Sequence, residues 1–238
     1  ISLSGDIGQD VTIEKEAGAE FQVALSALGS AADITDTTKV PTDTVFVLDL
    51  SNSMWTGGYT KIDQMIEGAN DAIKTLMRAN PQNRVAVVGY STKSSVLLPL
   101  GSYQAGSNFL TRSGDTVNMT ASKADDYGTV HNSSFQRLTI NSHKYTQHGI
   151  YTGMNILNTA DTKAIVGDTE VTRAPSLILM AEGEAKYGSK YFVNPSDDAE
   201  IGEVGDRATS RYAQSFVTAM TAAYMKEQVT KHYYGDKG

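Results

Sequence analysis

Side chains that bind hard metal ions follow the first of three short apolar runs in the sequence. Asp49 ends the run 44–49, and Ser51 and Ser53 lie two and four residues further on. A third hydroxyl, from Thr146, and a second carboxylate, from Glu182, come later in the chain. Carboxylate and hydroxyl oxygens suit Mg²⁺ or Mn²⁺ better than zinc. These residues are therefore candidate ligands of one divalent ion.

Strands and helices that alternate along the chain would bring these ligands together. Three continuous apolar runs are typical of strands buried on both faces: 44–49, 84–90 and 176–180. Two further strands are expected at 21–25 and 95–100. Apolar residues at helical spacing predict three helices: 61–78, 147–157 and 208–231. This order favours an α/β fold with a doubly wound, mostly parallel sheet flanked by helices.

Such a fold gathers the candidate ligands at one place. In open α/β sheets, ligands bind outside the carboxyl ends of the strands. Asp49 and Glu182 both follow buried strands, and Thr146 lies in the loop that precedes the middle helix. We therefore expect them to meet at one edge of the sheet.

The sequence divides into an N-terminal strand with a connector, residues 1–40, and a domain over 41–238. Residues 102–144 are polar and lack helical periodicity, so they are expected to be an insertion with a hairpin near 135–140. No strand follows the last helix. We therefore expect the final strand of the sheet to be missing and one edge to be open.

The three motifs together resemble the von Willebrand factor type A domain with its metal-ion-dependent adhesion site. Asp49, Ser51 and Ser53 match its Asp-x-Ser-x-Ser pattern, Thr146 its loop threonine, and Glu182 the acid of its Asp-Gly motif. The resemblance covers about 41–234. Flanking segments look like the version in Gram-positive surface proteins and pilus adhesins: Val-Leu-Asp-Leu-Ser-Asn-Ser-Met, Val-Ala-Val-Val-Gly-Tyr-Ser and Tyr-Thr-Gln-His-Gly-Ile. Glu182 departs from the family, where Asp is usual.

The resemblance implies a Rossmann-like fold and adhesion through Mg²⁺ or Mn²⁺, with Ca²⁺ also possible. An acidic residue of a host or matrix protein, or of another surface or pilus subunit, would complete the ion's coordination. The protein would then be extracellular, at the bacterial cell surface or cell wall. Residues expected to rim the ion are Met54, Trp55, Tyr59 and Gln147. Asp49→Ala is expected to abolish metal-dependent binding and to leave the fold largely intact.

Composition excludes several other classes of protein. The 238 residues include 20 Lys and Arg against 27 Asp and Glu, for a net charge of −7, which argues against nucleic-acid binding. The absence of cysteine excludes disulfides and thiolate chemistry. No apolar run approaches the roughly 20 residues that a membrane span needs.

Other interpretations of the same residues remain open. The chain could be a structural subunit of a surface filament whose metal site is vestigial or only stabilises the fold. Asp49 and the serines could simply cap the following helix, and Trp55 could be a packed loop residue. An enzyme is not expected. Ser91 lacks the second glycine of a nucleophile elbow because Lys93 occupies that place, and a metal-dependent hydrolase would need a general base near Asp49.

Overall fold

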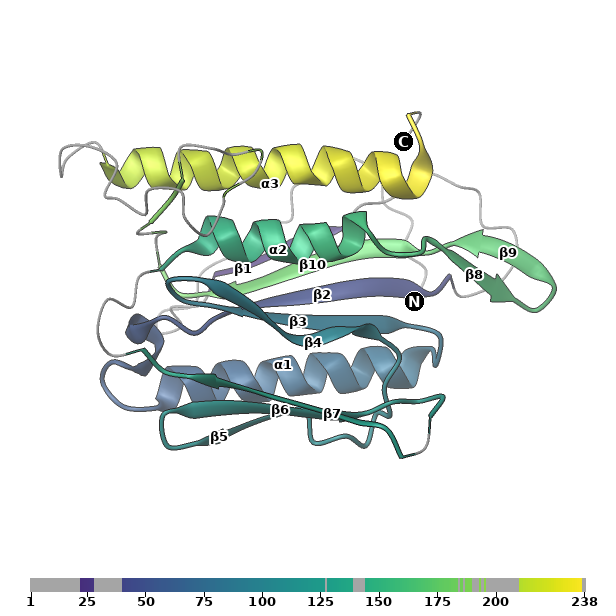
Figure 1. Ribbon diagram of the computed structural model, residues 1–238, viewed down its shortest axis with the longest axis horizontal. Coiled ribbons are helices and arrows are strands. Elements are labelled where there is room, and N and C mark those ends of the chain that lie inside the picture. Colours follow the sequence, from purple (N-terminus) through teal and green to yellow (C-terminus); the bar gives the residue numbers. More distant parts are fainter. Residues whose placement is uncertain are drawn as a thin grey trace.

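A computed structural model of the protein describes the backbone of residues 22–27, 40–126, 128–138, 144–183 and 210–236, with a few single positions between 185 and 195. Figure 1 shows a central sheet between two layers of other elements. Helices α2 (Thr146–Asn158) and α3 (Ser210–Tyr234) lie on one side of it. Helix α1 (Thr60–Ala79) and a small second sheet lie on the other. None of the described helices is long and apolar enough to cross a membrane.

The central sheet has five strands in the order β1-β10-β2-β3-β4. Its three inner strands are parallel: β10 (Ala174–Ala181), β2 (Thr42–Asp49) and β3 (Arg84–Tyr90). The two outer strands run antiparallel to them: β1 (Gln22–Ala27) and β4 (Ser94–Gly101). This arrangement confirms the predicted doubly wound α/β fold, with both edge strands reversed.

Strand β2 supplies side chains to both faces of the sheet. Val45, Phe46, Val47 and Leu48 are all fully buried. Because successive side chains of a strand point to opposite faces, Phe46 and Leu48 pack with α1, while Val45 and Val47 pack with α2 and α3. The continuous apolar run is thus explained by burial on both sides.

Helix α2 lies unusually close to the sheet because its sheet-facing side carries glycine. A Cβ atom at Gly153 would come within 2.8 Å of Val47, and one at Gly149 within 2.6 Å of the Tyr90 ring. Any larger residue at these positions would push the helix outward. The two glycines therefore fix how near the first turn of α2, with Thr146, comes to the ends of β2 and β3.

The predicted insertion is largely a second sheet. Its strands are antiparallel and ordered β5 (Leu110–Ser113), β6 (Thr116–Ser122) and β7 (Val130–Gln136). Val117 and Met119 are fully buried in the core around α1, and the Asn70 amide exchanges two 2.8 Å hydrogen bonds with the backbone of Leu110. The insertion is therefore part of the core. Of the hairpin expected near 135–140, residues 135 and 136 end β7, which pairs antiparallel with β6, and residues 139 and 140 lie outside the described part.

Two further features differ from the sequence prediction. Strand β1 pairs with β10 from Gln22 opposite Ala181 to Ala27 opposite Ser176, so the edge of β10 is covered by the N-terminal strand and is not open as expected. The connector 28–39 lies outside the described residues. A hairpin of β8 (Lys163–Val166) and β9 (Thr169–Thr172) connects α2 to β10 along the chain and projects beyond the end of the central sheet (Figure 1).

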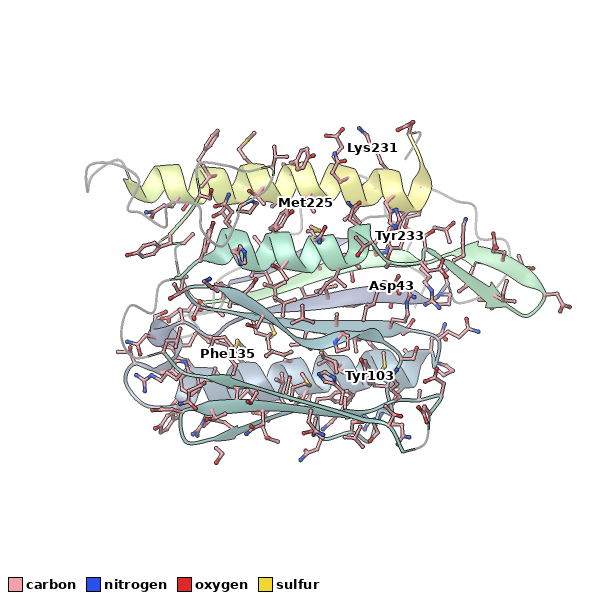
Figure 2. The ribbon with its side chains drawn as sticks, in the orientation of Figure 1. Asp43, Tyr103, Phe135, Met225, Lys231 and Tyr233 are labelled. Carbon is pink, nitrogen blue, oxygen red and sulfur yellow. The ribbon has the colours of Figure 1, made fainter. Side chains whose placement is uncertain are left out.

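The amino end of β2 is held by a buried carboxylate. Asp43 accepts hydrogen bonds from Arg84 Nε at 2.7 Å and Nη2 at 2.6 Å, and from the Tyr233 hydroxyl at 2.7 Å. Figure 2 shows Tyr233 of α3 and Asp43 of β2 at the same end of the molecule. Burial and the negative charge of Asp43 raise the pKa of Tyr233, so the phenol stays protonated and donates. This contact fastens α3 to the sheet.

We predict that Tyr233→Phe lowers the free energy of unfolding by about 1.5–3 kcal/mol, because a hydrogen bond to a buried charged group is lost. Urea denaturation measures the change. Tyr234→Phe is the matched control, since no hydrogen bond from that neighbouring hydroxyl is found among the described residues, and it should change stability by less than about 0.5 kcal/mol. Equal effects of the two substitutions would contradict the assignment.

Candidate functional site

The carboxyl ends of β2, β3 and β10 lie side by side at one edge of the central sheet. Asp49 is the last residue of β2 and pairs with Tyr90 at the end of β3, while Glu182 directly follows β10. The first helical residue of α2, Thr146, donates a 3.2 Å hydrogen bond to the Tyr90 hydroxyl. The structure therefore brings the predicted residues to one edge, as the parallel topology requires. We call this region the carboxyl edge.

Asp49 is fully buried and held by several groups. Its Oδ1 accepts a 2.9 Å hydrogen bond from the backbone N–H of Ser51. Burial, followed by the negative charge of Asp49, raises the pKa of the Tyr90 phenol. The phenol beside this carboxylate therefore stays protonated. The Asp49 side chain is thus fixed in position.

The hydroxyl groups of the predicted site hydrogen-bond within the edge. Ser51 Oγ and Ser53 Oγ lie 3.0 Å apart and share a hydrogen bond. Thr146 is directed to Tyr90, as described above. The short helix η1 (Asn52–Trp55) starts within this motif, and the Met54 N–H bonds the Ser51 carbonyl at 3.0 Å. The alternative in which Asp49 and the serines cap the following helix is wrong, because Tyr59 stands at the N-cap position of α1.

The second predicted carboxylate, Glu182, pairs with a lysine of α1. Lys61 Nζ contacts Glu182 Oε1, with the two side chains 35% and 17% exposed. The other oxygen, Oε2, is buried and has no hydrogen-bond partner among the described residues. The pair joins the start of α1 to the loop after β10.

A residue that the sequence motifs do not include faces Asp49. Lys144 Nζ lies 3.0 Å from Asp49 Oδ2, and the two side chains are 4% and 0% exposed. Sequence reasoning missed it because a lysine outside any motif is normally expected at the surface. Its only signal is its place two residues before Thr146, which brings it to the same edge.

The fit of a divalent ion depends on this lysine. Asp49, Ser51 and Ser53 provide oxygens of the right chemistry for Mg²⁺ or Mn²⁺. However, one Asp49 oxygen accepts the Ser51 N–H and the other faces the Lys144 ammonium. As arranged, these residues do not fit a divalent ion, and the predicted metal set stays a prediction from sequence.

Three of the four predicted rim residues are buried, so this part of the prediction is wrong. Met54 and Trp55 are 0% and 3% exposed and pack in the core around α1, with Trp55 Nε1 donating to the Leu50 carbonyl at 3.2 Å. Gln147 is also fully buried, and its amide donates to Thr221 of α3 at 2.9 Å. Only Tyr59 is exposed, at 41%.

The second sheet supports the loop that carries Tyr59. The Arg112 guanidinium of β5 lies 3.9 Å from the centre of the Tyr59 ring and forms a two-point ion pair with Asp63. Arg137, just after β7, donates to Asn52 Oδ1 at 2.7 and 3.0 Å. Stacked and forked arginine contacts of this kind fix geometry as well as charge. The insertion therefore orders the loop between η1 and α1.

A shallow groove adjoins the carboxyl edge. It is lined by the turn after β3 and by the end of β7: Ser91, Thr92, Lys93, Ser95, Ser134, Phe135, Gln136 and Leu138. Figure 2 shows Phe135 on the side of the central sheet that faces the second sheet. Leu138 is 43% exposed. The groove adds apolar surface to an edge that is otherwise polar.

Comparison with known proteins supports the sequence resemblance over part of the chain. Residues 44–129 match the family model of the von Willebrand factor type A domain. This segment contains Asp49, Ser51 and Ser53 but ends before Lys144, Thr146 and Glu182.

Among solved structures, the chain is similar to the pilus adhesin SpaC from Lactobacillus rhamnosus GG, with 13% sequence identity and a TM-score of 0.40. The likeness covers 89% of this chain and 28% of the adhesin chain, so this chain spans less than a third of the adhesin's length. A likeness this distant carries no argument about function. No curated protein matches the chain.

The buried ion pair changes the expected effect of removing Asp49. We predict that Asp49→Ala lowers the free energy of unfolding by about 3–5 kcal/mol, because it leaves the Lys144 ammonium buried without its counter-charge. This replaces the expectation that the fold would be largely unaffected. Adding Lys144→Met should restore most of the lost stability, and urea denaturation of the single and double variants tests this.

The matched control for Asp49→Ala is Glu182→Ala. It breaks a partly exposed pair at the same edge and should cost no more than about 1 kcal/mol. A double variant no more stable than Asp49→Ala would show that the buried charge is not the cause.

Proposed function

We propose that the chain is a protein-binding domain of the adhesion type and that the carboxyl edge is its recognition surface. The observation that carries this proposal is the match of 44–129 to the type A domain family, within which Asp49, Ser51 and Ser53 gather at an edge built by rigid parallel strands. Binding residues concentrate on loops held by such scaffolds.

The exposed parts of the edge give the surface its chemistry. Residues 56–60 are all exposed, and Gly57 and Gly58 have φ of 82° and 106°, which only glycine adopts readily. Tyr59 extends from this loop, and Leu138 lies in the adjoining groove. Aromatic and apolar groups among polar ones are typical of protein-binding surfaces. A protein partner therefore suits this edge.

The sequence motifs support a proposal for the location and the partner of the domain. The resemblance to Gram-positive surface and pilus proteins supports an extracellular position at the bacterial cell surface. A host or matrix protein, or another surface or pilus subunit, would be the partner. A metal-bridged version would join Asp49 to an acidic residue of that partner through Mg²⁺ or Mn²⁺. Since the ammonium of Lys144 faces Asp49, this proposal does not depend on the ion.

A second candidate function is favoured by the buried pair itself. If the Asp49–Lys144 contact serves the fold alone, the chain would be a structural subunit of a surface filament with a vestigial metal site. The two candidates differ in whether exposed groups of the carboxyl edge bind a separate protein.

We predict that the protein binds at least one immobilised matrix protein from a panel of collagen, fibronectin, fibrinogen and mucin. Tyr59→Ser and Leu138→Ser should each weaken that binding by about tenfold or more, as loss of a central aromatic or apolar contact does. Biolayer interferometry measures the change.

The matched control is Ile165→Ser. This side chain is 57% exposed on the β8–β9 hairpin, at the opposite end of the sheet, and should leave binding unchanged. Binding that only Ile165→Ser weakens would contradict the proposed surface. Self-association without matrix binding would favour the filament subunit.

A further inference from the structure

The backbone next to Lys144 is held at the carboxyl edge. Its carbonyl accepts the Tyr187 N–H at 3.2 Å, and the next residue, Tyr145, donates its N–H to Ser91 at 2.9 Å. Tyr145 is 1% exposed, and its ring stacks on the His148 ring with the two ring centres 5.2 Å apart. Both hydrogen bonds hold the peptide group that joins Lys144 to Tyr145, and the Lys144 side chain lies inside the edge, at 4% exposure.

The ammonium lies between the loops that hold the candidate ligands. On one side, Nζ is 3.0 Å from Asp49 Oδ2. On the other, it lies 4.0 Å from the point where a Cβ at Gly183 would be, and Gly183 directly follows Glu182. A cation bound by Asp49 has to approach an oxygen of that carboxylate. The oxygen left after the Ser51 N–H contact is Oδ2, which has no hydrogen-bond partner among the described residues and which the Lys144 ammonium approaches to 3.0 Å.

Each of the two candidate carboxylates already has a positive partner among the described residues. Asp49 faces the ammonium of Lys144, and Glu182 faces that of Lys61. A divalent ion at Asp49 would place two more positive charges beside a buried ammonium, where repulsion is screened less than in water. A divalent ion would also have to lose most of its hydration to enter this closed position.

We infer that Lys144 is the built-in cation of this site: its ammonium takes the place at Asp49 that a divalent ion would take. The carboxyl edge is therefore assembled without metal. An ammonium suits this role because it is a compact charge with three donors and can balance a carboxylate without an octahedral shell. The inference goes beyond the proposed function because it concerns the cation at Asp49 and requires no partner.

Calorimetric titration of chelator-treated protein with MnCl₂ and MgCl₂ tests this inference. We expect the wild-type chain to have no Mn²⁺ or Mg²⁺ site that depends on Asp49. Its titration should therefore be the same as that of Asp49→Asn. Lys144→Ser frees the Asp49 oxygen and adds a hydroxyl, so it should bind Mn²⁺ at least about tenfold more tightly than the wild type, and Asp49→Asn should abolish the gained site. Lys93→Ser is the matched control, because Lys93 is exposed on the turn after β3 at the same edge, and it should gain nothing.

Two results would overturn the inference. One is a Mn²⁺ or Mg²⁺ site in the wild type that Asp49→Asn removes, and the other is a folded Lys144→Ser variant that binds Mn²⁺ no better than the wild type. If Lys144→Ser does not fold, the wild-type titration still decides, because a divalent site dependent on Asp49 contradicts the inference and its absence supports it. No partner is present in these titrations, so their failure is distinct from failure of the proposed function.

Discussion

Burial of β2 on both faces is the constraint on which the rest of the structure depends. A strand whose side chains are fully buried in both directions needs a layer on each side, and α1 and α2 provide those layers. Because β10, β2 and β3 are parallel, every connection from a strand to the next layer starts at the same edge. The polar residues that end these strands have no other place to lie. The carboxyl edge is therefore a result of the core.

Each end of β2 carries a buried carboxylate, and each is balanced by a positive side chain from a distant part of the chain. Asp43 is held by Arg84 and by the phenol of Tyr233, whereas Asp49 faces Lys144. A buried charge without a partner costs several kcal/mol, so these pairs are required once the acids are buried. At the amino end the contact fastens a helix. At the carboxyl end it sets the charge of the candidate recognition surface.

Much of the fold was predictable because apolar periodicity reports burial directly. The runs at 44–49 and 84–90 and the helix at 61–78 appear almost as expected. Interactions between distant residues were not predictable in this way. The pairing of β1 with β10 depends on backbone hydrogen bonds that carry no side-chain pattern, and the second sheet buries only alternate residues such as Val117 and Met119. Trp55 was expected at the surface because nothing in its neighbourhood shows that the insertion covers it.

The motif residues of the candidate site could be predicted from the sequence. The positive side chain that balances the charge of Asp49 could not. The position of Asp49 at a strand end follows from the sequence, but the lysine that faces it lies 95 residues further on, in a segment without periodicity. The metal set therefore remains a prediction from resemblance.

The separation of the two buried carboxylates has a consequence for variation. Asp43 and Asp49 are six residues apart on one strand, which at about 3.3 Å per residue places them roughly 20 Å from each other. Effects of substitutions at that distance are normally additive, because the sites share no partners. Exposed residues at the carboxyl edge can therefore be replaced, and the binding preferences of the domain can change with them. The contact of Asp43 with Tyr233 at the amino end would still hold α3 on the sheet. Recognition can therefore change at the exposed positions of this edge, whereas Asp49 itself is tied to stability through its buried pair with Lys144.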